Sequence, residues 1–218
     1  AAIYRQILDQ RPDMPLAYLH LAFLQWDLGQ VAQAIETLEI AIRRGVHSLE
    51  IQARLGTYLA ESGDARRAVA LLEGAVPTDT SDLDALTALG IAYARGGQPA
   101  RALSTFERIL ALDAANTMAQ ENIGAVRLQQ RDLDGAQRAF DAALARNPRS
   151  ARAEAGLAVI ALRRGDRDGA IAGWKRAIAL DPRDYDSLVN LGQELARAGS
   201  LAEAAPYLRL FVDTAPPF

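Results

Sequence analysis

Three pairs of aspartates, each pair separated by one residue, have the types and spacing best suited to chemistry, because two close carboxylates can act as general acid and base. The pairs are Asp132 and Asp134, Asp166 and Asp168, and Asp184 and Asp186. Each pair stands where a helix is predicted to begin, and Asp at that place caps unpaired backbone N–H groups and complements the helix dipole. We therefore interpret all three pairs as structural rather than catalytic.

The remaining groups that could support chemistry are few. His20 and His47 lie on different predicted elements, with no carboxylate or second histidine at a metal-ligand spacing. The absence of cysteine excludes disulfides, thiolate catalysis and cysteine-based metal sites. The glycines form neither a GxGxxG nor a GxxxxGK[ST] phosphate-binding pattern. The sequence thus predicts a protein that is not an enzyme and that carries no metal or other cofactor.

The composition predicts an all-helical protein. The 218 residues are 50% hydrophobic but only 6% aromatic, and they are rich in Ala, Leu, Arg, Gln and Glu, which favour helices. A formal charge of -3 with both signs interspersed gives no general attraction for nucleic acid or an anionic membrane surface. No apolar run approaches the length that spans a membrane, so no membrane insertion is expected.

The elements that must position any site are set by a 34-residue period. One column of the repeat is glycine, another is invariantly alanine, and a third holds small residues that each follow a Leu or Ile. The columns are Gly29, Gly63, Gly97, Gly165 and Gly199; Ala34, Ala68, Ala102, Ala136, Ala170 and Ala204; and Ala22, Gly56, Gly90, Gly124, Ala158 and Gly192. Small residues allow two helices to approach closely, and glycine suits the left-handed residue that ends a helix.

A fourth column holds the bulky side chains expected to fill the space between helices. Its members are Leu38, Leu72, Phe106, Phe140, Trp174 and Leu208. Proline follows several of the second helices, as at Pro148 and Pro182, where it prevents the helix from continuing. The period, the small-residue columns and the closing Asn147-Pro148 and Asp181-Pro182 dipeptides resemble the tetratricopeptide repeat, over about residues 15–218.

The resemblance implies an all-α, right-handed α-α superhelical solenoid of antiparallel helix pairs with a concave inner surface. We expect a single domain over residues 1–218, in which residues 1–14 are the tail of a preceding repeat. The six repeats are 15–48, 49–82, 83–116, 117–150, 151–184 and 185–218. First helices are predicted at 15–28, 49–62, 83–96, 117–130, 151–164 and 185–198, and second helices at 31–44, 65–76, 99–112, 133–146, 167–180 and 201–214.

Three departures from the pattern and one capping motif lead to specific expectations. Arg131 replaces a turn glycine and is expected to adopt a less strained turn. Pro77 should end the preceding helix early, and Pro206 should kink the last helix or delay its start. Ser200 and Glu203 have the spacing of a capping box.

The family resemblance implies that the first helices line the concave surface, and one stripe of each then faces inward. The stripes are largely apolar, which favours a surface covered by a ligand. We expect a peptide-binding groove formed by Leu19, Phe23, Trp26, Ile91, Arg95, Met118, Leu128, Val159, Leu162, Arg163, Gln193 and Arg197.

Charge changes sign along these stripes. The early ones carry Asp27, Glu50, Glu61 and Asp84, and the later ones carry Arg95, Arg152, Arg163 and Arg197. Such an arrangement would orient an extended or helical peptide of opposite polarity, with its acidic part near Arg163 and Arg197.

Other interpretations of the stripes stay open. Phe23 and Trp26 could pack against a preceding repeat, and the later apolar residues could belong to the core if the stripe is rotated by one position. The clamp with which some relatives bind C-terminal carboxylates is unsupported, because no first helix contains Lys and the matching Asn122 and Asn190 lie two repeats apart. The asparagine ladder of sugar-transferring relatives is also unsupported, because the matching positions are His20, Arg54, Ala88 and Gly156.

The leading functional prediction is a protein–protein interaction scaffold that binds a protein or peptide ligand. One alternative is a regulatory or substrate-positioning domain of a larger enzyme or secretion complex. Another is self-association, as a homodimer, through the apolar last helix with Leu208, Leu210 and Phe211. The start within a helix, without Met, leads us to expect a piece of a longer protein, and the composition resembles that of GC-rich bacteria. Cytoplasm and periplasm both remain open.

Overall fold

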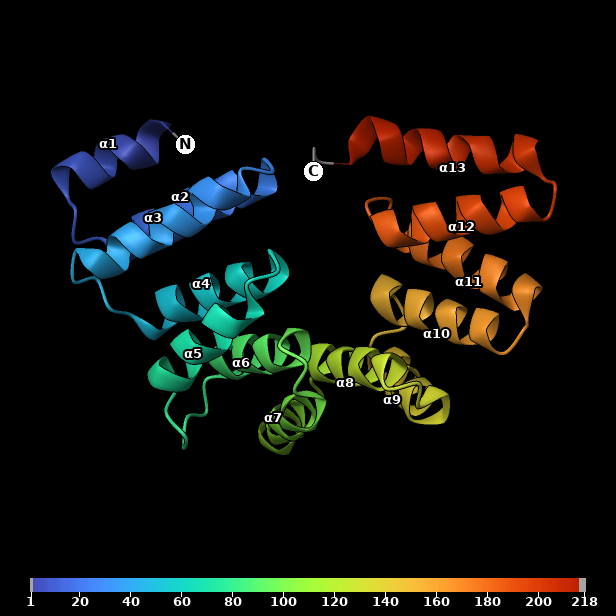
Figure 1. Ribbon diagram of the computed structural model, residues 1–218, viewed down its shortest axis with the longest axis horizontal. Helices are drawn as coiled ribbons and strands as arrows, with labels where there is room; N and C mark the ends of the chain where they lie inside the picture. The colour runs from blue at the N-terminus through green and yellow to red at the C-terminus, as the bar shows by residue number, and fades with distance from the viewer. Residues whose placement is uncertain (1, 216–218) are drawn as a thin grey trace. The chain divides into compact units, whose positions relative to one another are not determined.

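The computed structural model describes residues 2–215, and these residues form thirteen α-helices and no strand (Figure 1). The helices are α1 (Ala2–Gln10), α2 (Pro15–Asp27), α3 (Val31–Arg43), α4 (Leu49–Glu61), α5 (Ala65–Ala75), α6 (Leu83–Arg95), α7 (Pro99–Leu112), α8 (Thr117–Gln129), α9 (Leu133–Arg146), α10 (Ala151–Arg163), α11 (Arg167–Leu180), α12 (Tyr185–Arg197) and α13 (Leu201–Thr214). The twelve predicted repeat helices are confirmed. The first helices begin at the predicted residues and end one residue earlier, and α5 ends early before Pro77, as expected.

The helices divide into two compact units. One contains α1–α7 and ends at Leu112, and the other contains α8–α13 and starts at Asp113. Within each unit a first helix packs against the second helix that follows it, as in the α4–α5 and α10–α11 pairs. First helices of successive repeats also contact one another, as α4 contacts α6 and α8 contacts α10.

The small residues of one helix leave room for the bulky side chains of the next helix, as the sequence predicts. A Cβ atom built on Gly90 would lie 2.5 Å from Phe106 Cε1, and one on Gly56 would lie 2.5 Å from Leu72 Cδ1. Five of the six bulky side chains, from Leu38 to Trp174, are buried, and Leu208 is half-buried. These contacts join the two helices of each repeat and form the core of each unit.

Gly90→Ala is expected to destabilise the protein by about 1–3 kcal/mol, because the added methyl group overlaps the Phe106 ring. Gly74→Ala is the matched control, because nothing lies within 4 Å of a Cβ at that position in α5. This control should stabilise the protein by about 0.5–1 kcal/mol through helix propensity alone. Urea unfolding of both variants checks the prediction, and two changes of the same sign would contradict it.

The turns between helices differ from the sequence-based expectation at one residue, Arg131. The predicted turn glycines adopt left-handed conformations, as Gly63 does with φ 97° and Gly165 with φ 88°. Arg131 adopts the same left-handed conformation, with φ 63°, so the expectation of a less strained turn was wrong. The chain must turn at Arg131 to enter the next helix, and this requirement outweighs the steric cost of a Cβ atom in the left-handed conformation.

The last helix differs from the sequence-based expectation. It begins at Leu201 and continues through Pro206, so its start is not delayed. The Ser200 side chain makes no capping hydrogen bond, and Glu203 instead accepts a hydrogen bond from Lys175 Nζ at 2.6 Å, so the capping box was wrong. The Lys175 ammonium is the stronger partner because it is charged.

The apolar residues of α13 contact their own chain. Leu208, Leu210 and Phe211 pack against the core of α10–α13, and the Phe211 ring meets Tyr185 edge-on at 6.2 Å. Val212, by contrast, is 75% exposed. Most of the apolar surface that suggested self-association is therefore covered within the unit.

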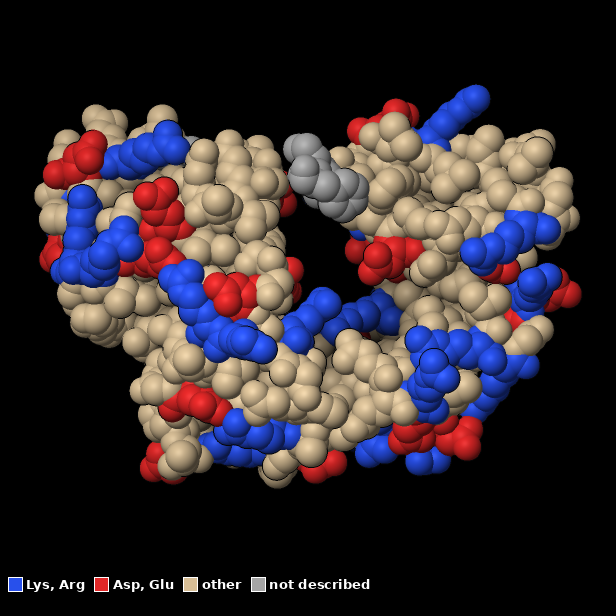
Figure 2. Space-filling model, in the orientation of Figure 1, with Lys and Arg blue, Asp and Glu red and all other residues tan. Residues whose placement is uncertain are grey.

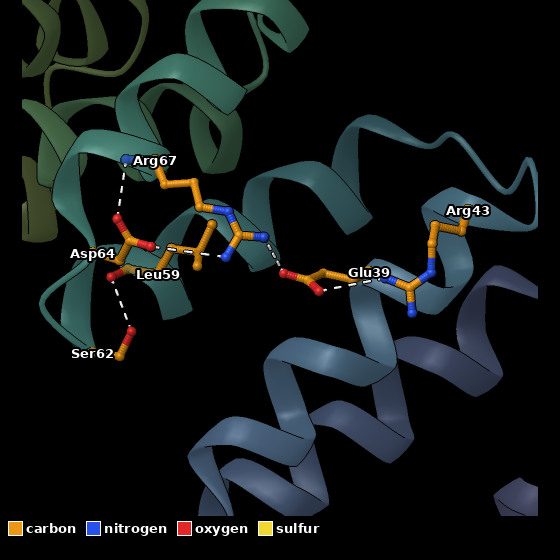
Figure 3. Close-up of polar contacts among 6 residues, drawn as sticks. All are labelled: Glu39, Arg43, Leu59, Ser62, Asp64 and Arg67. Carbon is orange, nitrogen blue, oxygen red and sulfur yellow. Dashed lines mark hydrogen bonds and ion pairs between the residues drawn. The ribbon is translucent and has the colours of Figure 1, made fainter.

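Second helices of successive repeats are linked by ion pairs at a spacing of 28 residues. Glu39 of α3 bonds Arg67 of α5 and also pairs with Arg43 at 3.5 Å, while Arg67 lies 3.8 Å from Asp64 (Figure 3). The same spacing joins Arg101 to Glu73 and Lys175 to Glu203. Apart from the half-buried Glu39, the residues of these pairs are exposed, so each pair contributes at most about 1 kcal/mol to stability.

Candidate functional site

The first aspartate of each pair is an N-cap, and the second lies in the first turn of the same helix. In each pair the first carboxylate accepts a hydrogen bond from the backbone N–H three residues later, at 2.8–3.1 Å: Asp132 from Gly135, Asp166 from Gly169 and Asp184 from Ser187. The capping role predicted at these helix starts is confirmed for Asp132, Asp166 and Asp184. His20 stacks on Tyr4 with ring centroids 5.4 Å apart, and among residues 2–215 no group of His, Asp and Glu is arranged to hold a metal ion.

Asp132 gains a second partner. The Gly135 N–H and then the Arg127 guanidinium hydrogen-bond its carboxylate, and both hold the pKa of Asp132 below its ordinary value of 3.8. A lowered pKa means that the charged form stabilises the fold. This contribution is fully present above the ordinary pKa and is lost as the pH falls through the lowered one.

Asp132→Asn is therefore expected to lower the unfolding midpoint at neutral pH, because Asn keeps the cap but loses the charge that pairs with Arg127. The difference from the parent should shrink as the pH falls below about 4. Urea midpoints measured from neutral to acidic pH check this. A difference that stays constant over that range would mean that the charge of Asp132 is not involved.

The first helices of the unit of α8–α13 border a cavity of about 470 Å³. The first helices line it: α8 contributes Ala125 and Leu128, α10 contributes Ala155 and Val159, and α12 contributes Asn190. Small side chains at successive repeats leave this space open. An open cavity with an apolar floor can accept side chains of a partner.

Polar groups form the sides of the cavity. Arg152 donates from Nη2 to Asn122 Oδ1 at 2.7 Å, and Asp186 lies on the wall contributed by α12. Asn122 is 5% exposed, and its Nδ2 has no hydrogen-bond partner in the structure. The wall next to Asp186 also includes Asp181 and Asp184, so this surface is not uniformly basic.

The predicted groove residues of this unit fall into two groups. Leu128 and Val159 line the cavity, and Leu162 is half-buried against the core. The others are exposed: Met118, Arg163, Gln193 and Arg197. Two of these use their charge within the chain, because Arg163 donates to the Leu128 carbonyl at 2.7 Å and Arg197 bonds Glu194.

In the unit of α1–α7 one predicted residue, Trp26, takes part in an aromatic stack. The Trp26 ring lies flat on the Tyr58 ring, with centroids 4.0 Å apart and an interplanar angle of 9°. Phe23 is 55% exposed, while Ile91 is half-buried and Arg95 exposed. Leu19 was assigned to the surface wrongly: it is only 8% exposed, because it points into the packing between helices.

Sequence reasoning missed Tyr58. It lies on α4, and only the contact of α2 with α4 brings it under Trp26. Its hydroxyl is buried without a partner, and burial raises the pKa of Tyr58, so the group stays neutral. The signal in the sequence was that Tyr58 is an aromatic residue in the first helix of the repeat that follows Phe23 and Trp26.

The charged residues of the stripes are exposed, as expected, but both signs are interspersed over the surface (Figure 2). The clearest difference lies at the last residues of the first helices. Asp27 and Glu61 end α2 and α4, whereas Arg95, Arg163 and Arg197 end α6, α10 and α12.

The sequence of this chain matches a known family of repeat proteins. A family model described as "Tetratricopeptide repeat" matches residues 53–119, 121–174 and 156–217, and a second model with the same description matches residues 1–54. No curated relative matches the sequence. In the part of the chain that the structure describes, no helix combines the length and apolar character needed to cross a membrane.

Several solved structures are similar. A thermophilic TPR protein of Thermus thermophilus aligns with a TM-score of 0.73 and 21% identity over 82% of this chain and 97% of its own. A chain of the APC/C hetero-tetramer Cut9–Hcn1 aligns with a TM-score of 0.75 and 15% identity over 100% of this chain and 43% of that chain. YrrB, described as a TPR protein with an unusual peptide-binding site, aligns with a TM-score of 0.52 and 19% identity over 86% of this chain and 96% of its own. At these identities the likeness establishes the all-α superhelical repeat fold alone.

Proposed function

The chain belongs to the tetratricopeptide repeat family, whose members generally act as protein-interaction scaffolds, and we propose that it binds a peptide or helical segment of a partner on the faces of its first helices. The six repeats would act as one domain without catalysis of their own. Phe23, Trp26, Met118, Leu128 and Val159 are the proposed apolar contacts. We propose a protein partner rather than a nucleic acid, because the formal net charge is -3 and charges of both signs are interspersed over the face in Figure 2.

The observation that carries the proposal is the cavity of α8, α10 and α12. Its floor consists of Ala125, Leu128, Ala155 and Val159, and an apolar surface of this kind gains free energy when a partner excludes water from it. Arg152 and Asn190 border the floor and can bond the polar backbone of a bound segment. Apolar contacts would therefore supply affinity, and the polar border would fix orientation.

Capture of partners from a lysate tests the proposal when two matched variants are compared with the parent. Ala125→Glu places a charge on the cavity floor, whereas Ala145→Glu places the same charge on the exposed side of α9. Both should keep the helical content of the parent by circular dichroism. We expect partners to be retained by the parent and by Ala145→Glu and lost by Ala125→Glu. Equal retention by all three would place binding elsewhere.

Self-association is the second candidate, because Leu201 and Val212 on α13 are 67% and 75% exposed. Light scattering after size exclusion tests it. A parent dimer that Val212→Glu converts to a monomer would support this candidate, and a monomeric parent at high concentration would exclude it.

A further inference from the structure

The cavity of α8, α10 and α12 has aromatic rings in its lining. Phe140 of α9 and Trp174 of α11 both line it, and both belong to the bulky column of the repeat. The edge of an aromatic ring carries a partial positive charge and its face a partial negative one, so aromatic side chains attract one another edge to face. The lining therefore offers a further ring a contact that an aliphatic side chain does not make.

Gly156 of α10 leaves backbone without a side chain beside the Phe140 ring. The equivalent positions of the neighbouring repeats, 34 residues before and after, hold Asn122 and Asn190. A side chain at Gly156 would displace the ring, because a Cβ atom there would lie 2.4 Å from Phe140 Cζ. The cavity at this place has a volume of about 470 Å³, which is enough for a large side chain and the backbone next to it.

Charges of both signs border the cavity. Arg152 donates from Nη2 to Asn122 Oδ1 at 2.7 Å and, among the described residues, forms no ion pair with a carboxylate. Asp186 lies on the wall with Asp181 and Asp184, and the last two accept hydrogen bonds from backbone N–H groups at 2.9 and 3.1 Å. A lysine or a glutamate of a partner would therefore each meet at least one charge of its own sign.

We propose that this cavity takes an aromatic side chain, Phe, Tyr or Trp, of the partner segment. The ring would lie against Phe140 and Trp174 and beneath the guanidinium of Arg152. A face of that group stays available, because its hydrogen bond to Asn122 lies in the guanidinium plane. A ring face complements the charge of Arg152 without adding a formal charge that the aspartates would repel. This inference rests on the proposed function and names the class of side chain that the cavity takes.

The two tryptophans of the chain provide a probe and an internal control. Trp174 lines the cavity, whereas Trp26 lies on Tyr58 in the unit of α1–α7. We would record the indole N–H signals of the ¹⁵N-labelled full chain during titration with a capped pentapeptide, in which serine and glycine flank a central phenylalanine on each side. Matched peptides carry cyclohexylalanine, lysine or glutamate at the centre. Trp26→Phe assigns the two signals.

With the phenylalanine peptide we expect the Trp174 signal to shift saturably while the Trp26 signal stays fixed. Affinity is taken from the concentration dependence of the shift, so it does not depend on the size of the shift. Cyclohexylalanine has a saturated ring of similar size, so it measures apolar burial without the aromatic contribution. Its peptide should bind about ten-fold more weakly. The lysine and glutamate peptides should bind more weakly still, because each would bring a charge onto an apolar floor.

Two arginine variants separate the contact with Arg152 from general charge. Arg152→Gln keeps a donor for Asn122 but removes the guanidinium, and should lower the affinity for the phenylalanine peptide about five-fold. Its affinity for the cyclohexylalanine peptide should change less than about two-fold, because a saturated ring has no quadrupole to lose. Arg146→Gln makes the same charge change at an exposed position of α9 and should change either affinity less than about two-fold. Both variants should keep the helical content of the parent by circular dichroism.

Four results would overturn the inference. These are equal binding of the phenylalanine and cyclohexylalanine peptides, tighter binding of the lysine or glutamate peptide, equal effects of Arg152→Gln and Arg146→Gln, and no shift of the Trp174 signal with the phenylalanine peptide. The first three leave peptide binding at the cavity intact, so they reject the aromatic side chain without rejecting the proposed function. The last rejects the inference, and the capture experiment decides the proposed function separately.

Discussion

Phe140→Ala is expected to destabilise the unit of α8–α13 by about 3–5 kcal/mol. The ring is 2% exposed and lies between two glycines. Cβ atoms on Gly124 and Gly156 would approach its Cζ to 2.7 and 2.4 Å, so this ring alone fills the space that both glycines leave on α8 and α10. Its removal leaves a cavity that two helix backbones cannot collapse into, and the full cost of lost contacts is retained.

Phe23→Ala is the matched control, because its ring is 55% exposed on α2. Its cost should stay below about 1 kcal/mol. Urea unfolding followed by circular dichroism measures both changes. A cost for Phe140→Ala no larger than that for Phe23→Ala would mean that the small-residue columns do not organise the packing.

The second large effect concerns binding. Ala155→Phe should fill the cavity of α8, α10 and α12 and weaken binding of a captured partner by about 100-fold, because the new ring occupies the space of the partner's side chains. Stability should change by less than about 1 kcal/mol, because the ring extends into open space. The dissociation constant of the partner, measured by calorimetry, checks the prediction.

Ala145→Phe on α9 is the control and should leave the dissociation constant unchanged, because this alanine is exposed on a second helix. If Ala155→Phe bound the partner as well as the parent does, the cavity would have no part in recognition. If both variants lost binding equally, added aromatic bulk rather than position would be the cause.

The helices could be predicted from the sequence because each repeat has the same residue types at the same positions. A glycine such as Gly90 must face a bulky residue such as Phe106, and that relation is visible as two columns sixteen residues apart. Capping was equally predictable at Asp132 and Asp166, where the side chain bonds a backbone group three residues away. Local hydrogen bonds of this kind need no knowledge of the tertiary structure.

Prediction from the sequence failed where a contact with another helix determines the position or the bonding partner of a side chain. Glu203 bonds Lys175 of α11 instead of capping its own helix, and Leu19 turns into the core although its helical position placed it on the surface. Tyr58 lies under Trp26 only because α2 and α4 pack together. The cavity itself depends on which side chains are absent from three helices, and no single helix reveals it.

Site-specific photo-crosslinking tests the central claim, that first-helix faces bind the partner, most directly. A photoreactive amino acid would replace Met118 on α8 or Gln193 on α12, and Ala145 on α9 or Ala172 on α11; all four positions are exposed. We predict that partner proteins from a lysate form adducts at positions 118 and 193 and not at positions 145 and 172. Adducts formed mainly at positions 145 and 172 would contradict the account, because binding would then take place on the second helices.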